Sequence, residues 1–178
     1  MNEIIKKNGI TFGVVTGLVS VLITTLIYII DLKLFTSWWL GILNIIIYIT
    51  IGVILLVKTK KELNGVFPFK DAFTTYFISA VIGILISVAF NIVLFNFVDP
   101  GAKDTIKELT IKFAVEMMEK FNTPADAVNQ AVKEMQAVDN YSIAQLLKGS
   151  VFAILFSAIF GLILAAIFKS KSASSQGL

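Results

Sequence analysis

Cysteine, histidine and arginine are all absent from this 178-residue chain. Without cysteine and histidine, the chain cannot form disulfides, thiolate or imidazole metal sites, or a cysteine nucleophile. It also lacks the usual proton carrier at neutral pH, which is histidine. All 15 basic residues are lysine, so the bidentate guanidinium that commonly binds phosphate is missing. We therefore expect no metal, no cofactor and no nucleic-acid partner.

Charge is also scarce, because only 15% of the residues are charged while 57% are hydrophobic, and the mean hydropathy is +0.86. Charged residues separate four apolar stretches, in which we place membrane spans at residues 9–30, 38–57, 72–98 and 149–168. About 20 apolar residues, rising about 1.5 Å each, cross a hydrocarbon core of about 30 Å as a helix. The predicted fold class is an all-α polytopic membrane protein with four transmembrane helices, in a single membrane domain over residues 1–178.

The lysines predict the orientation, because loops rich in lysine stay in the cytoplasm. With the amino terminus inside, the cytoplasmic segments hold eight lysines and three acidic residues, and the outer segments hold seven lysines and nine acidic residues. Inverting the chain would expose the lysine-dense turn at residues 58–61 outside. We therefore expect a multi-pass membrane protein with both termini in the cytoplasm. Trp38 and Trp39 would open the second span at the outer interface, where aromatic residues are enriched.

A polar segment at residues 99–148 separates the third and fourth spans and is long enough for structure of its own. Asp99-Pro100-Gly101 would end the third helix. Thr123 as N-cap and Pro124 at N1 would begin a second helix in this segment. We predict an extracytoplasmic αα-hairpin insertion between the third and fourth membrane helices, because apolar residues recur at three- and four-residue spacing on both sides of the break. These residues are Ile106, Leu109, Phe113, Met117 and Phe121, followed by Val128, Ala131, Val132, Met135 and Val138.

The apolar side chains of this hairpin have two possible uses. They could close against the second hairpin helix and the end of the bundle, or they could dock a partner. The candidate partner surface comprises Phe113, Met117, Met118, Phe121 and Met135. After the hairpin, Ser142 predicts a helix cap with Gln145, so the fourth helix would begin before the membrane. Residues 169–178 are small and polar, and we expect a disordered cytoplasmic tail there.

Small residues recur at every fourth position in three spans. Such stripes let helix backbones approach closely in lipid. Packing within one four-helix bundle is the interpretation we favour, and a surface for a partner or a second copy is the alternative. The residues are Gly9, Gly13 and Gly17 in the first span, Ser79, Gly83 and Ser87 in the third, and Ala153, Ser157, Gly161 and Ala165 in the fourth.

Asn44, Asn91 and Asn96 are the strongest polar residues inside the spans. They could line a substrate path, but asparagine in a membrane helix is commonly a hydrogen-bonding residue between helices, and we favour that role. The apolar stretches contain no ionisable side chain, whereas proton-coupled carriers and charged filters usually need one at depth. They also lack an Asp pair or a Ser with a basic partner, so we expect no catalytic residue and no enzyme.

Three segments of the chain resemble a known bacterial family. They are the glycine-bearing first span at residues 13–18, the basic turn at 58–61, and the run from Gly65 through Phe69-Lys70-Asp71-Ala72-Phe73 into the third span. The chain is similar in these segments, and in its four-span layout, to the family catalogued as domain of unknown function 4199. The resemblance implies a small four-span protein of a Gram-negative inner membrane without an assigned activity. It carries over no functional residues, and the outer hairpin does not contribute to it.

The sequence is compatible with two functions. The leading hypothesis is a non-enzymatic accessory or scaffold subunit, in which a four-helix anchor in the lipid bilayer displays the hairpin to another membrane protein or to a second copy of itself. The alternative is an oligomeric small transporter or channel subunit. Four helices with no ionisable interior hardly make a polar pore alone, so the size of the detergent-extracted particle would separate the two.

Overall fold

Four long apolar helices dominate the computed structural model, which describes residues 2–170. They are α1 (Glu3–Ile30), α2 (Trp38–Glu62), α3 (Phe69–Val93) and α6 (Ile143–Phe168), and a π-helical turn, η2 (Leu94–Val98), prolongs α3. A 3-10 turn, η1 (Leu32–Thr36), joins α1 to α2, and α4 (Pro100–Lys120) and α5 (Ala125–Ala137) lie between η2 and α6. The long helices, with η2 counted in the third, are each long and apolar enough to cross a membrane. The predicted all-helical class with four such helices is confirmed.

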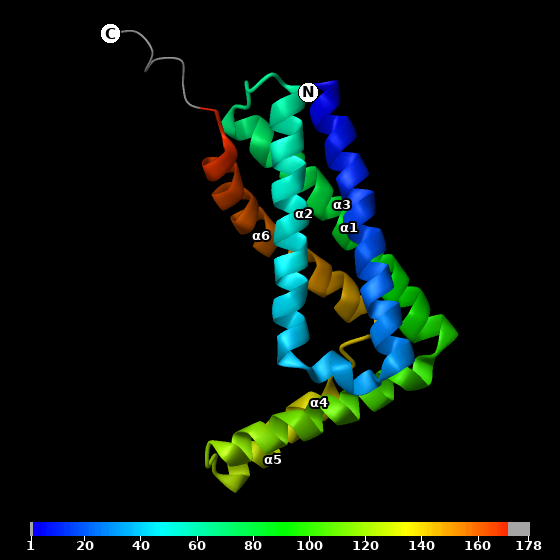
Figure 1. The fold of residues 1–178 in the computed structure, drawn as a ribbon. Coiled ribbons are helices and arrows are strands. Elements are labelled where there is room, and N and C mark those ends of the chain that lie inside the picture. Colours follow the sequence, from blue (N-terminus) through cyan, green and yellow to red (C-terminus); the bar gives the residue numbers. More distant parts are fainter. Residues whose placement is uncertain (1, 171–178) are drawn as a thin grey trace.

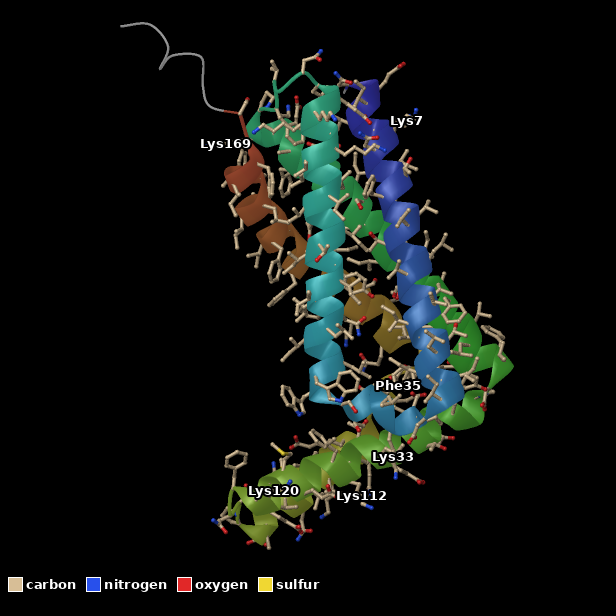
Figure 2. The ribbon with its side chains drawn as sticks, in the orientation of Figure 1. Lys7, Lys33, Phe35, Lys112, Lys120 and Lys169 are labelled. Atoms are coloured by element: carbon tan, nitrogen blue, oxygen red, sulfur yellow. The ribbon has the colours of Figure 1, made fainter. Side chains whose placement is uncertain are left out.

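The helices are arranged as an L (Figure 1). The four long helices form the upright bundle, and α4 and α5 run across one end of it and project sideways beyond α2. Both ends of the described chain lie at the opposite end of the bundle, where Lys7 and Lys169 are found, whereas Lys33, Lys112 and Lys120 lie near α4 and α5 (Figure 2). We call these the terminal end and the hairpin end, and we call α4 with α5 the hairpin arm.

Side-chain caps set several helix boundaries. The Asp99 carboxylate accepts a hydrogen bond from the Ala102 backbone N–H at 3.1 Å, and Pro100 occupies the first turn of α4, where a missing N–H costs nothing. The Ser142 hydroxyl accepts from the Gln145 N–H at 3.4 Å, so α6 begins before its apolar stretch, as its sequence predicted. Thr123 does not cap α5, because the residue before its first turn is Pro124, whose ψ of 141° is extended. That predicted cap was wrong by one residue.

The turn between α2 and α3 needs backbone conformations with positive φ. Asn64 has a φ of 52° and Gly65 a φ of 82°, and the Gly65 N–H closes the end of α2 by donating to the Lys60 carbonyl at 2.9 Å. Beyond this turn Phe67 is fully buried. Its backbone N–H and carbonyl are bonded to Ser170 at 3.1 and 2.8 Å. Ser170 was predicted to lie in a disordered tail and is instead held against this loop; residues 171–178 lie outside the described residues.

Helix α3 is the centre of the bundle, because it packs against α1 along most of its length and against α6 at the terminal end. The terminal end is closed by an apolar cluster that includes Leu56, Phe67, Ala72 and Leu164. The last turns of α2 also pack at the terminal end. There the side-chain amide of Asn8, from α1, donates to the Thr59 hydroxyl at 3.2 Å and to the Glu62 carboxylate at 2.7 Å. The core is therefore tightest at the terminal end, and the space described below lies nearer the hairpin end.

Candidate functional site

The glycines of α1 form its contact surface with α3. A Cβ added at Gly9, Gly13 or Gly17 would lie 3.0, 2.7 or 2.6 Å from Ile78, Ile82 or Ile86, respectively. The separations at Gly13 and Gly17 are shorter than carbon atoms tolerate, and the one at Gly9 is tight, so glycine permits this approach of the two backbones. From the other helix, a Cβ at Gly83 would lie 2.9 Å from Thr16.

The serines of the α3 stripe, Ser79 and Ser87, lie on the same contact surface. The Ser20 hydroxyl donates to the Ser87 hydroxyl at 2.7 Å, and Ser79 is buried. The structure thus brings the stripe of α1 and the stripe of α3 together. Dispersion contacts and one interhelical hydrogen bond hold this pair, which is how helices associate where lipid removes the hydrophobic drive.

The stripe on α6 is divided between two environments. Gly161 and Ala165 are buried, and a Cβ at Gly161 would lie 2.8 Å from the Tyr76 ring of α3. Ala153 is exposed and Ser157 is half-buried, and both line a cavity. Only the half of this stripe near the terminal end therefore packs against another helix.

The three intramembrane asparagines bond mainly to their own helices. The Asn44 side chain donates to the Leu40 carbonyl at 2.9 Å and that of Asn91 to the Ser87 carbonyl at 2.7 Å. Asn96 also donates to the Tyr141 carbonyl, 45 residues away, at 3.0 Å. The prediction that the asparagines form hydrogen bonds between helices was thus wrong for Asn44 and Asn91. The Asn44 side-chain oxygen is buried without a hydrogen-bond partner.

Helix α2 leans away from α6 at the hairpin end. Its buried residues, Gly52, Leu55, Leu56 and Thr59, all lie in its second half, whereas Trp38 is 71% exposed. At Gly52 the two helices meet, since a Cβ there would lie 2.8 Å from Tyr76 and 3.5 Å from Leu164.

The divergence leaves a cavity of about 600 Å³ between α1, α2, α3 and α6. A second, smaller cavity of about 360 Å³ lies between α1, α2 and η1 and is lined by Asn44 among others.

An aromatic cluster closes the hairpin end of the bundle. The Phe95 ring lies 4.5 Å from the Tyr141 ring and 5.8 Å from the Phe35 ring, measured between centroids. Phe35 reaches this cluster from η1, between the bundle and the hairpin arm (Figure 2). Burial raises the pKa of Tyr141 to about 12, so its phenol stays neutral at physiological pH.

The hairpin arm is anchored at its base by this cluster. Ala102 and Ile106 of α4 are buried in it. The Tyr28 hydroxyl donates to the Asp99 carboxylate at 2.8 Å, which ties the start of α4 to the end of α1. These contacts hold the first turns of α4 to the bundle.

Helix α4 has two apolar faces rather than one. Ile111, Ala114, Val115 and Met118 are half-buried and share the side of α4 on which α5 packs. Phe113 and Met117 are each 37% exposed, and they follow Ile106 by about two and three turns, so they share its face.

The candidate partner surface is accordingly divided. Met118 and Met135 are half-buried within the arm, whereas Phe113, Met117 and Phe121 remain exposed. The uncovered apolar face of the arm consists of these last three residues.

One ion pair fixes the far end of α5 to the base of α4. The Lys103 ammonium lies 2.8 Å from the Asp139 carboxylate. Burial acts to raise the pKa of Asp139, but the hydrogen bonds from Lys103 and the Tyr141 N–H, with the charges of Lys103 and Lys107, lower it. Glu108 and Lys112, and likewise Glu116 and Lys120, lie four residues apart on α4, but neither pair forms an ion pair within the described residues. Within residues 2–170, no group of three acidic side chains is arranged to hold a metal ion.

Comparison with known proteins identifies the family. The family described as "Protein of unknown function (DUF4199)" matches residues 11–170. The chain belongs to this family. The match confirms the resemblance seen in the sequence, and it covers α1 from residue 11 onward, the other three long helices and the hairpin arm of this DUF4199 protein. No curated protein and no solved structure matches the chain.

The sequence did not predict the larger cavity. Asn140, Gln145 and Gly149 line it at the hairpin end, and Tyr48 and Tyr76 line it deeper in the bundle. The charge-free stretch that begins at Gly149 marks a span but not a cavity. The angle between α2 and α6, on which the cavity depends, has no signal in the local sequence.

Proposed function

We propose that this DUF4199 protein is a non-enzymatic accessory or scaffold subunit of a bacterial inner membrane, in which the hairpin arm binds another membrane protein. The observation that supports this most strongly is the uncovered apolar face of an anchored arm. A connection between α3 and α6 needs only a few residues, whereas this one is a pair of packed helices. Anchoring lowers the conformational entropy that the arm would lose on binding, so its exposed rings can contribute more to affinity.

The direction of the uncovered face indicates where the partner sits. Because Ala102 and Ile106 of the same face are buried against the bundle, Phe113 and Met117 point to the membrane side of the arm. The arm projects beyond α2, so this face looks into the inner angle of the L (Figure 1). We place the partner's transmembrane helices in that angle, beside the exposed apolar side chains of α2 and α6, with its extramembrane surface against Phe113 and Met117. From the lysine distribution we assign the arm to the extracytoplasmic side.

Site-specific photo-cross-linking in living cells tests this function. A photoreactive amino acid at position 113 or 117 should give a cross-link to one discrete membrane protein. Glu108 and Glu119 are the matched controls, because they are exposed and lie on the opposite side of α4. Positions 108 and 119 should give no such product. Cross-links of equal strength from all four positions, or none to any protein, would exclude the arm as a docking surface.

The larger cavity favours a second candidate function, the oligomeric small transporter or channel subunit. Its lining residues reach from Asn140 at the hairpin end to Gly52 deep in the bundle, and none of them is charged. A pore would need several copies to surround a continuous polar path. The mass of the protein extracted in detergent separates the candidates, since the scaffold requires one copy per partner and the pore requires a homo-oligomer.

A further inference from the structure

The larger cavity has the form of a binding site that opens toward lipid. Its walls come from α1, α2, α3 and α6. Ile45 of α2 and Phe156 of α6 both line it and are 53% and 65% exposed, so the gap between these two helices is not closed by protein. From Gln145 to Phe160 the lining follows α6 for about 22 Å, at about 1.5 Å per residue. One leaflet of hydrocarbon is about 15 Å thick, half of a core of about 30 Å, so the cavity is long enough to hold one lipid chain.

The chemistry of the lining changes along its length. Most of the hydroxyl groups are satisfied inside the protein: Ser20 donates to Ser87 at 2.7 Å, and Ser150 and Ser157 donate to carbonyls of their own helix at 2.7 and 2.8 Å. The deeper wall is largely apolar, and its side chains include Ile49, Ile84 and Phe160. At the hairpin end the side-chain amides of Asn140 and Gln145 provide neutral hydrogen-bonding groups.

The geometry points to a site for one acyl chain of an amphiphile, whose uncharged polar part lies at Asn140 and Gln145 and whose chain lies along α6. A void of this size between packed helices forfeits dispersion contacts along its whole wall. The surrounding solvent is lipid, and the exposed gap between α2 and α6 lets a chain enter sideways. No lining residue is charged, so the site has no counter-charge for an ionic headgroup.

Gly149 allows the cavity to be filled without disturbing the bundle. It lines the cavity, and a Cβ at this position would meet no atom within 4 Å. Gly149→Phe therefore places a ring where the chain would lie. Ala153→Phe fills the cavity one turn deeper and serves if the first variant is poorly extracted. Val151→Phe is the matched control, because Val151 is exposed on the same helix and does not line the cavity.

The test uses the full chain in nanodiscs of phosphatidylethanolamine and phosphatidylglycerol that carry a photoactivatable group on one acyl chain. Adducts mapped by mass spectrometry should concentrate on lining residues such as Ile45, Leu146 and Phe160. Gly149→Phe and Ala153→Phe should each lower these adducts about tenfold, which corresponds to about 1.4 kcal/mol of lost binding, and Val151→Phe should leave them unchanged.

Competition with unlabelled amphiphiles identifies the source of the chain. Displacement by added monoacylglycerol but not by phospholipid assigns a neutral amphiphile, and the reverse assigns a membrane phospholipid whose uncharged ester group, rather than its headgroup, lies at Asn140 and Gln145. The inference is overturned by adducts spread evenly over lipid-facing residues such as Leu155 and Ile159, by no adducts in the cavity, by displacement with neither competitor, or by equal adducts in the filled and control variants.

Discussion

Replacing glycine by alanine at two positions isolates the close contact between α1 and α3. At Gly13 the new methyl group would lie 2.7 Å from the Ile82 Cβ and 3.0 Å from the Ser79 carbonyl oxygen. At Gly41 of α2 it would meet nothing within 4 Å. Both substitutions gain helix propensity of up to about 1 kcal/mol, so that gain cancels between them.

The remaining difference is the cost of the clash. Forcing a methyl group into a packed contact costs about 1–3 kcal/mol, and the Ser79 oxygen belongs to the backbone, which cannot move aside as a side chain can. We therefore expect Gly13→Ala to be less stable than Gly41→Ala by about 1–3 kcal/mol. Gly41→Ala itself should match or slightly exceed the native protein.

Reversible denaturation in detergent micelles, followed by circular dichroism, measures both free energies of unfolding. Leu18→Phe provides a second control on α1, because Leu18 is 59% exposed toward lipid. Equal stability of Gly13→Ala and Gly41→Ala would mean that the two backbones do not approach as closely as the structure has them.

Two further changes test polar groups. Asn44→Leu removes a buried carbonyl oxygen that has no partner, so it should raise the free energy of unfolding by about 1 kcal/mol in detergent, and a loss of stability would indicate that the Asn44 side-chain oxygen has a partner. Because the pKa of Asp139 is lowered in the fold, its carboxylate stabilises the fold above its unfolded pKa of about 3.9, and that contribution is lost as the pH falls through the folded pKa. Lys103→Met should reduce this acid loss, which is at most about 1 kcal/mol because the Asp139 side chain is 41% exposed, and an unchanged pH profile would exclude the pair as its source.

The spans and most of the helix ends could be predicted because they depend on local chemistry. A charge-free stretch of sufficient length must be helical in lipid, whichever helix it packs against. Asp99-Pro100 and Ser142 cap helices through backbone groups within three residues, so their signals are read directly from the sequence. The helices nevertheless extend past the predicted spans, as α1 does to Glu3, because a helix need not stop where the hydrocarbon stops.

The surface of the hairpin arm could be predicted only in part, because pairing of helices is a long-range choice. Spacing placed Met118 and Met135 among the candidate contact residues, but both are half-buried in the arm. The sequence of α4 has two apolar faces, and either of them could have packed against α5. The selected arrangement is fixed by contacts such as that between Lys103 and Asp139, which lie 36 residues apart. For the same reason the asparagines could not be assigned to partners, since each has a carbonyl of its own helix in reach.

Labelling of single cysteines tests the orientation on which the proposed function depends, and the native chain contains no cysteine to interfere. Cysteine would be introduced at Thr36 and Asn129 toward the hairpin end and at Asn64 in the turn at the terminal end. An impermeant thiol reagent applied to intact spheroplasts should label positions 36 and 129 and leave position 64 unlabelled until the membrane is opened. Labelling at 64 without labelling at 129 would show that the protein has the opposite orientation, with the hairpin arm in the cytoplasm. That result would contradict the account.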